Sequence, residues 1–410
     1  MNAMDIIPFP RKRLDKADLD LAATLQALVE KEIVDKRLEL KEDYEQLLAP
    51  SFARIMSEIG LQKMFWPEEH GGEGHNGPDA AYTVVAALEQ IGRADTGLAF
   101  LAAHSLALQA ALATEGARRE ETCAAFASLF CSGDRPVRVS FILPALTEEE
   151  GAPEWRGKGF QAAATRVGET WKVSGRMARP TCCGLDADLF GAWCAVAGGE
   201  PAFILVPGDA PGIHRGAELK KTGLAASRNA DLERLETTVP DANCAWRGNE
   251  GIFRLLSWYC LGIAATASGA LLANYEIVRE WGDNRVIKGK DHTFKDNPLT
   301  AAVMGEVAKE TGVVRLLAYE LAGMLSEPGE YGGDGSQALY TMALMLAHQT
   351  CASAEYAINR TMELMASAGY AKEWQLERYW RDVKAMQCHL GAYELAKHDF
   401  ARWFYDTVTL

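Results

Sequence analysis

The sequence has little positive charge. Its 42 Lys and Arg residues are outnumbered by 56 Asp and Glu residues, which gives a formal net charge of −14 at pH 7. Binding the phosphates of a nucleic acid requires clustered cations. The one basic run, Arg11-Lys12-Arg13, lies close to the start of the chain. The composition therefore argues against a nucleic-acid-binding protein.

The sequence is also short of cysteine and of long apolar runs. Nine cysteines in 410 residues are too few for a disulfide scaffold, and an odd number cannot pair completely. No CxxC or HxxxH-type pair occurs, and the adjacent Cys182 and Cys183 would point to opposite faces of a strand, so we expect no metal site. No uninterrupted apolar run reaches the roughly 18–20 residues of a membrane helix, and the N-terminus lacks the features of a signal peptide. We expect a cytoplasmic protein with reduced cysteines and no membrane contact.

What the sequence does contain is typical of a large globular protein. Apolar residues make up 48% of the chain and charged residues 24%, so enough surface can be buried to offset the chain entropy. At about 150 residues per domain, the length predicts two to three domains. Near the N-terminus, Leu21, Leu25 and Leu28 recur at the spacing of one helical face. We expect an N-terminal helical domain over residues 1–130.

The middle of the chain has a different pattern. From about residue 135 to 239 the apolar period falls towards two, and short runs end at turn residues such as Gly168-Glu169. Strands that follow one another without helices favour an antiparallel barrel or sandwich over a doubly wound sheet. We therefore expect a middle antiparallel β-barrel domain over residues 131–245. The predicted strands are Val137–Leu143, Gln161–Val167, Thr170–Ser174, Leu189–Val196 and Ala202–Val206.

Helical patterns return after Pro240. Four long helices joined by short loops predict a C-terminal four-helix bundle over residues 246–410, and the whole chain is then of the α+β class. Gly369 is expected to end the third helix, because glycine commonly follows a helix C-terminus. The predicted helices are Phe253–Asn284, a stretch marked by the apolar stripe Val303 to Leu321, Ser336–Ala368 and Ala371–Tyr405.

A set of motifs is spread in order along this helical, β, helical chain. They are Pro67-Glu68-Glu69-His70-Gly71-Gly72-Glu73-Gly74, Glu89-Gln90-Ile91-Gly92-Arg93-Ala94-Asp95, Leu146-Thr147-Glu148, Lys221-Thr222-Gly223-Leu224, Glu377-Arg378-Tyr379 and Arg381-Asp382. Together they resemble the acyl-CoA dehydrogenase family over nearly the whole chain. The resemblance implies a tetramer that holds FAD between the β-domain and the C-terminal bundle, with an acyl-CoA thioester against the flavin. An electron-transfer flavoprotein is a further partner compatible with it.

The chain departs from this family at the catalytic base. The resemblance implies a glutamate that removes the α-proton of the thioester while a hydride leaves the β-carbon for the flavin. A carboxylate in a dry, oriented site suits this weakly acidic proton. The glutamate immediately precedes the glycine that corresponds to Gly391, and this chain has Leu390 there; an alternative base position falls at or near Tyr259. Leucine cannot accept a proton, and a tyrosine with an ordinary pKa of about 10 is protonated at neutral pH.

The resemblance also assigns cofactor-binding residues. Thr147 is expected to contact the flavin, and Thr181 lies where the family's Trp-Ile-Thr segment is replaced. Arg285 matches an arginine that contacts the FAD pyrophosphate across the subunit interface. Glu363 replaces a glutamine at that site, where a carboxylate would be repelled by the pyrophosphate. The remaining predicted cofactor-binding residues are Gly369 and Gly391.

His389 is the remaining candidate for catalysis, because it precedes Leu390. A neutral imidazole could act as an acid or base, as in flavin monooxygenases of this fold, and an ordinary histidine at a helix end is the alternative. Three hypotheses follow. The chain is one subunit of a heteromeric FAD-dependent acyl-CoA dehydrogenase whose partner chain supplies the glutamate, or a flavin-dependent monooxygenase, or a non-catalytic structural subunit. For the first, bulky steroid-type, side-chain or fatty acyl thioesters are the expected substrates.

Overall fold

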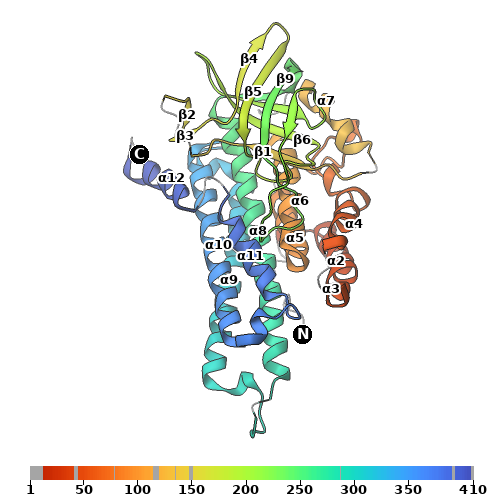
Figure 1. Cartoon of the computed structure of the whole chain (residues 1–410), viewed down its shortest axis with the longest axis vertical. Coiled ribbons are helices and arrows are strands. Elements are labelled where there is room, and N and C mark those ends of the chain that lie inside the picture. The colour runs from red at the N-terminus through yellow and green to blue at the C-terminus, as the bar shows by residue number, and fades with distance from the viewer. Residues whose placement is uncertain are drawn as a thin grey trace.

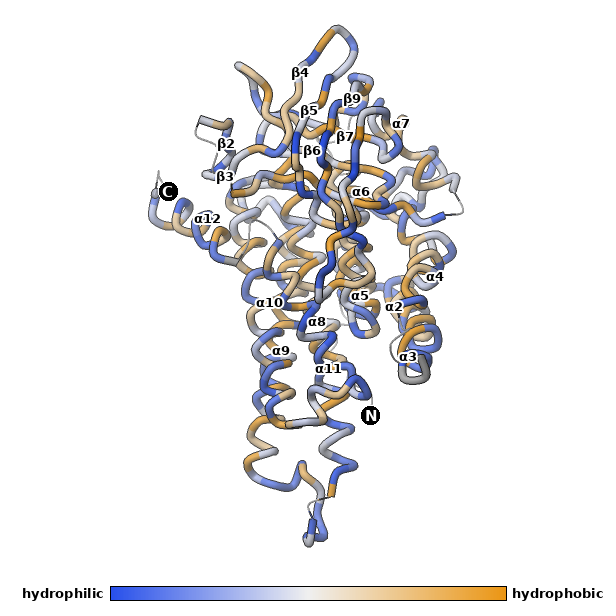
Figure 2. The backbone as a smooth tube through the Cα atoms, in the orientation of Figure 1, coloured by the Kyte–Doolittle hydropathy of each residue, from blue (hydrophilic) through white to orange (hydrophobic). Residues whose placement is uncertain are grey.

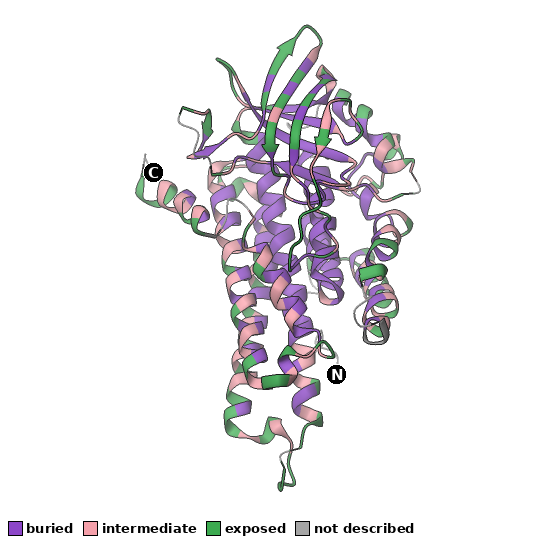
Figure 3. Ribbon diagram, viewed as in Figure 1, coloured by how far each residue is buried: buried purple, intermediate pink, exposed green. Residues whose placement is uncertain are grey.

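The computed structural model describes residues 13–40, 45–77, 79–113, 120–133, 135–146, 151–286, 288–389 and 393–407. The predicted α+β fold, with an N-terminal helical part, a middle sheet and a C-terminal bundle, is confirmed (Figure 1). The sheet lies across one end of the long bundle, and the N-terminal helices pack alongside the bundle next to the sheet. Buried residues concentrate where these three parts meet, and exposed residues increase towards the far end of the bundle (Figure 3).

The N-terminal part is a set of helices around one central apolar helix. Helix α2 (Lys16–Val29) is capped by Asp15, whose carboxylate accepts the N–H of Asp18 while the Asp18 carboxylate accepts the N–H of Asp15, so two helix-end donors are satisfied. The helices of this part are α2 (Lys16–Val29), α3 (Asp35–Leu40), α4 (Leu48–Ala53), α5 (Ala80–Ala94), α6 (Thr96–Ala113) and α7 (Glu120–Cys131). Helix α6 is buried on all sides and places its residues against both the sheet and the bundle.

The middle part is a single large sheet. Within the described residues it has eight strands, in the order β10-β7-β6-β4-β5-β9-β8, with β1 also paired to β6. A separate two-stranded hairpin joins β2 to β3. The strands are β1 (Val139–Ile142), β2 (Glu154–Trp155), β3 (Lys158–Gly159), β4 (Ala163–Val167), β5 (Thr170–Ala178), β6 (Leu189–Val196), β7 (Ala202–Pro207), β8 (Ile213–Arg215), β9 (Leu232–Pro240) and β10 (Cys244–Arg247).

The sheet differs from the predicted antiparallel pattern at one strand. Strand β6 runs parallel to both β1 and β4, whereas its pairing with β7 is antiparallel. Almost every residue of β6 is buried, as expected for a strand covered on both faces, whereas buried and exposed residues largely alternate along β9. The predicted hairpin is present: Val167 pairs with Thr170, and Gly168 takes the positive φ of 61° that its turn requires.

The C-terminal part is the predicted bundle, except that two helices stand in place of the last predicted one. Its helices are α8 (Asn249–Asn284), α9 (Pro298–Ser326), α10 (Gln337–Met365), α11 (Leu376–Met386) and α12 (Tyr393–Tyr405). The loop that joins α8 to α9 at the far end of the bundle is mostly hydrophilic (Figure 2). By length and composition α6 and α8 could span a membrane, but the apolar part of each is completely buried within the fold, as in the core helices of a folded domain.

The predicted single helix from Ala371 to Tyr405 is wrong, because the chain forms α11 and α12 in its place. Helix α11 stays in the bundle, whereas α12 turns away towards the β2–β3 hairpin (Figure 1). There the buried carboxylate of Asp399 accepts bonds from Arg156 at 2.5 Å, Lys158 at 2.9 Å and the hydroxyl of Tyr340 at 3.2 Å. Burial raises the pKa of Asp399, but Lys158 and Arg156 outweigh it and hold that pKa below its ordinary value. This ion cluster fixes the direction of α12.

Helices α5 and α8 cross at a point where both backbones come close together. A Cβ added to Gly269 would lie 2.4 Å from the carbonyl oxygen of Glu89 and 2.7 Å from the backbone nitrogen of Arg93. A Cβ added to Gly92 would lie 2.9 Å from the carbonyl oxygen of Thr266. The crossing therefore needs glycine on both helices, and it fixes the N-terminal part against the bundle.

We expect Gly269→Ala to destabilise the protein by about 3 kcal/mol, because the added methyl group meets backbone atoms that cannot rotate away. The measurement is the shift in the urea midpoint of unfolding. Gly312→Ala in α9 is the matched control: its Cβ would meet nothing within 4 Å, and the change should be neutral or slightly stabilising. Equal midpoints for the two variants would contradict the tight crossing.

Candidate active site

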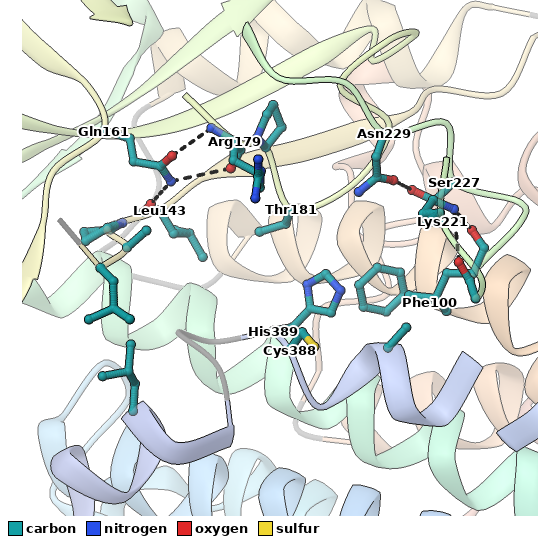
Figure 4. Close-up of a pocket in the computed structure, with 18 of the residues that line it drawn as sticks. Phe100, Leu143, Gln161, Arg179, Thr181, Lys221, Ser227, Asn229, Cys388 and His389 are labelled. Carbon is teal, nitrogen blue, oxygen red and sulfur yellow. Dashed lines mark hydrogen bonds between the residues drawn. The ribbon is translucent and has the colours of Figure 1, made fainter. Parts of the chain in front are cut away.

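A cavity of about 430 Å³ lies where the three parts of the chain meet (Figure 4). Its lining is mostly apolar with a few polar groups, as in most small-molecule sites. Helix α6 contributes Phe100, the segment after β1 contributes Leu143–Leu146, and the end of α11 with the turn after it contributes Ala385, Cys388 and His389. The sheet domain and α12 contribute Gln161, Arg179, Pro180, Thr181, Lys221, Thr222, Gly223, Leu224, Ser227, Asn229 and Leu395.

Gln161 joins two walls of the cavity. Its Nε2 donates to the carbonyl of Leu143 at 2.5 Å, and its Oε1 accepts the backbone N–H of Arg179 at 2.7 Å (Figure 4). The guanidinium of Arg179 makes two 2.8 Å bonds to the carboxylate of Asp231. These groups are engaged in holding the walls, so they give the cavity its fixed shape.

The opposite wall is held by an aspartate on α11. Leu224 takes a φ of 55°, which is uncommon for a residue other than glycine, and its N–H donates to Oδ1 of Asp382 at 2.5 Å. Burial raises the pKa of Asp382 to about 7, although the neighbouring Arg378 lowers it. Asp382 therefore ties the bundle to the loop that lines the cavity.

A histidine behind the cavity sets the direction of one hydroxyl in its wall. Nδ1 of His104 lies 2.8 Å from the carbonyl of Phe100, and Nε2 lies 2.9 Å from Oγ1 of Thr181. Burial lowers the pKa of His104 to about 4, so the ring is neutral at pH 7. A carbonyl can only accept, so we assign the single ring proton to Nδ1, and Nε2 accepts the proton of the Thr181 hydroxyl.

His389 faces the cavity from the turn that follows α11. Its ring centroid lies 4.4 Å from that of Phe100, and Figure 4 shows the imidazole pointing towards the space beneath Thr181. Burial, together with nearby His104 and Lys221, lowers the pKa of His389 to about 3. The ring is therefore neutral at physiological pH and presents a nitrogen lone pair.

The described residues that line the cavity include no Asp or Glu. Lys221 is there instead, and burial lowers the pKa of its ammonium group from the ordinary value. Tyr259 on α8 is buried among the rings of Phe100, His104 and Phe141, and its hydroxyl has no hydrogen-bond partner in the described part of the chain. Burial raises the pKa of Tyr259 well above its ordinary value, so it cannot act as a base.

The other sequence-predicted residues are distributed over the molecule. Arg285 is exposed at the far end of α8, with its guanidinium carbon 5.6 Å from the ring centre of Trp281. Glu363 is exposed on α10 and accepts bonds from two neighbours on that helix. Gly369 is buried, and a Cβ there would lie 2.6 Å from the carbonyl oxygen of Met362. None of these three lines the cavity of this chain. Thr147, Leu390 and Gly391 lie outside the described residues.

Of the predicted site residues, the structure brings Thr181 and His389 together in one cavity, with Tyr259 packed behind it. The sequence interpretation missed Phe100, Gln161 and Lys221. Lys221 belongs to a motif that was visible in the sequence, although its position in the cavity depends on the loop held by Asp382. Phe100 and Gln161 carry no such signal, because a phenylalanine on an apolar helix and a glutamine beside a strand are ordinary residues.

A helical part, a sheet and a bundle enclose a mostly apolar cavity at their junction, and the sequences of the two helical parts show which family this arrangement belongs to. The family model for the acyl-CoA dehydrogenase N-terminal domain matches residues 15–128, and the model for the acyl-CoA dehydrogenase C-terminal domain matches residues 248–405. The chain therefore belongs to the acyl-CoA dehydrogenase family, as the sequence motifs predict.

Curated relatives cover most of the chain at low identity. The short-chain specific acyl-CoA dehydrogenase of Rattus norvegicus is 26% identical over 396 residues, which are 92% of this chain and 87% of that protein. Glutaryl-CoA dehydrogenase of Desulfococcus multivorans is 24% identical over 368 residues, or 86% of each chain. Cyclohex-1-ene-1-carbonyl-CoA dehydrogenase of Syntrophus aciditrophicus is 23% identical over 386 residues, with 92% and 87% covered.

Solved structures show the same fold. Glutaryl-CoA dehydrogenase from Mycobacterium smegmatis superposes with a TM-score of 0.79 at 20% identity and covers 100% of this chain and 99% of its own. Butyryl-CoA dehydrogenase from Megasphaera elsdenii gives 0.76 at 18% identity, with 96% and 99% covered. A glutaryl-CoA dehydrogenase from Mycobacterium smegmatis in complex with FADH2 gives a TM-score of 0.75 at 19% identity, with 98% and 97% covered.

Family membership supports FAD as the cofactor, in agreement with the sequence prediction. The cavity fits a flavin ring by its chemistry. Such a ring is flat, with an apolar edge and an edge that carries carbonyl and N–H groups. Leu143, Pro180 and Leu224 offer apolar contacts, and Thr181 offers a hydroxyl oxygen. The ammonium group of Lys221 already donates to the backbone carbonyls of Gly223 and Leu224, so one of its three N–H groups remains for a ligand. These are the residues of this chain that would hold the ring.

Proposed function

We propose that this chain is one subunit of a heteromeric FAD-dependent acyl-CoA dehydrogenase whose partner chain contributes the catalytic carboxylate. The observation that carries the proposal is the absence of any Asp or Glu among the described residues that line the cavity. The sequence adds that Leu390 and Tyr259 occupy the two positions where the family pattern has its base. Removal of a proton from carbon needs a general base, so the reaction needs one from elsewhere.

In this proposal the chain's own residues bind and orient. The apolar walls exclude water, which strengthens the electrostatic interactions inside the cavity. Lys221 places positive charge there and favours the negative charge that develops on the thioester as its α-proton leaves. The partner's carboxylate would take that proton, and the chemistry that FAD would supply when bound is a hydride acceptor for the β-carbon. The curated relatives named above are dehydrogenases of CoA thioesters, which supports an acyl-CoA substrate, and an electron-transfer flavoprotein would reoxidise the cofactor.

The proposal is tested by expressing the chain alone and together with a second dehydrogenase-like chain that keeps glutamate before its final glycine. We expect the chain alone to give no dye reduction with acyl-CoA, and the pair to form a yellow hetero-oligomer that does. Sedimentation measures the stoichiometry, and the flavin spectrum measures cofactor content. Full dehydrogenase activity of the unmodified homomer would contradict the proposal.

The second candidate function is a flavin-dependent monooxygenase, and the position of His389 is what favours it. A neutral imidazole that faces the cavity could donate or accept a proton beside a flavin bound there, and such a flavin would supply the reaction with oxygen. Under this alternative, His389→Ala should abolish incorporation of ¹⁸O from O₂ into product and leave flavin bound. Cys388→Ala, at the adjacent cavity residue, is the matched control and should keep full incorporation. Unchanged incorporation in His389→Ala would count against the monooxygenase.

The third hypothesis, a non-catalytic structural subunit, predicts a chain that binds neither FAD nor acyl-CoA in any assembly.

A further inference from the structure

The hydroxyl of Thr181 has most of its hydrogen-bonding capacity used inside the protein. Its proton is accepted by Nε2 of His104, 2.9 Å away, and one oxygen lone pair accepts the backbone N–H of Phe141 at 3.1 Å. A hydroxyl has one proton and two lone pairs. The thiol of Cys182 also interacts with this hydroxyl, but the thiol proton is donated to the carbonyl of Val139 at 3.2 Å. Because Thr181 lines the cavity, what remains available to a ligand is at most one lone pair.

The surroundings of His104 hold this arrangement in place. The imidazole is completely buried, and its centroid lies 4.6 Å from Phe100, 5.3 Å from Phe141 and 4.8 Å from Tyr259. Nδ1 is occupied by the carbonyl of Phe100, one turn earlier on α6. The burial that lowers the pKa of His104 also keeps the ring neutral, so Nε2 stays an acceptor.

We propose that His104, acting through Thr181, makes this wall of the cavity a hydrogen-bond acceptor and thereby favours reduced over oxidised FAD. The inference rests on the proposed FAD site. A reduced flavin ring carries an N–H that the oxidised ring lacks, whereas the oxidised ring has a bare nitrogen that needs a donor. A hydroxyl that can only accept a hydrogen bond can pair with the N–H of the reduced ring and not with the bare nitrogen of the oxidised ring. His104 is a positioning residue in this account, because it touches neither flavin nor substrate.

The test measures the dissociation constants of oxidised and reduced FAD, anaerobically, for the holoprotein with any partner chain it requires. Thr181→Val removes the acceptor, and we expect the ratio of reduced to oxidised affinity to fall about tenfold, as for one hydrogen bond. For a two-electron couple a tenfold change corresponds to about 30 mV, so potentiometry provides an independent reading. Thr181→Ser keeps the hydroxyl and should restore the ratio.

His104→Phe keeps an aromatic ring and removes Nε2, which frees the Thr181 proton to point into the cavity. We expect the ratio of reduced to oxidised FAD affinity to fall at least as far in His104→Phe as in Thr181→Val. The double variant His104→Phe/Thr181→Val should have the same ratio as Thr181→Val alone. Tyr259→Phe is the matched control, because it alters a hydroxyl in the same ring cluster that has no partner among the described residues. Its ratio should equal that of the unmodified protein.

A purely structural role for His104 would weaken the binding of both forms of FAD equally and leave the ratio unchanged. An unchanged ratio in Thr181→Val overturns the inference even where His104→Phe does not fold. Failure of the unmodified assembly to bind either form of FAD overturns the proposed function, and this inference with it. Bound FAD with equal ratios in all variants overturns this inference alone.

Discussion

Leu390→Glu is expected to raise the acyl-CoA dehydrogenase activity of this chain in the absence of a partner. The substitution restores a carboxylate at the position where the family pattern has its base, directly after His389, which faces the cavity. A positioned general base contributes about 10²–10⁴-fold to the rate, so we expect a gain of that size. The measurement is dye reduction by acyl-CoA in the presence of FAD.

Leu390→Gln is the control for this gain, because it has the shape of glutamate without the charge. Only the glutamate variant should gain activity, and its rate should fall at low pH as the carboxylate becomes protonated. Equal rates for the two variants would show that the missing base is not what limits the chain.

Arg315→Met is expected to cost about 3–5 kcal/mol of stability, because it leaves a buried carboxylate without its counter-charge. Arg315 on α9 lies 2.7 Å from Oε2 of Glu89 on α5, and Ser268 on α8 donates to Oε1 of Glu89 at 2.6 Å. The side chains of the pair are only 2% and 0% exposed. The measurement is the midpoint of urea unfolding.

The double variant Glu89→Leu/Arg315→Met distinguishes a lost charge partner from a general packing defect. Replacing a buried ion pair by apolar side chains is often close to neutral, so most of the lost stability should return. A double variant no more stable than Arg315→Met would indicate that packing, and not charge, accounts for the loss.

The overall fold could be predicted because most of its helices and strands have local sequence patterns that indicate them. The strand Leu189–Val196 has the predicted bounds, and the turn at Gly168 follows from its glycine. Strand β9 was not predicted, because its apolar residues Leu232, Leu235 and Val239 are spaced by three and four residues and not by two. The parallel pairing of β6 with β1 joins segments about 50 residues apart, and nothing in either segment specifies the other.

The candidate site was predicted less completely than the fold, for a physical reason. Thr181 and His389 could be named because of the motif and sequence position in which they occur. The hydrogen bond from Thr181 to His104 depends on a separation of 77 residues and on which ring nitrogen faces a carbonyl, neither of which a sequence pattern shows. The same is true of Asp382 and Leu224, where a backbone N–H in a left-handed conformation meets a carboxylate on a distant helix.

The carboxylate of Asp399 has a consequence for how the molecule is completed during synthesis. Arg156 and Lys158 leave the ribosome more than 200 residues before their counter-ion does, since the two bonds span 243 and 241 residues. Until α12 has been made, neither cation can enter its final position without a large desolvation cost. We therefore expect the β2–β3 hairpin to dock only after translation has passed Asp399. A protease that removes Asp399 with the residues after it should release this hairpin from α10 and α12.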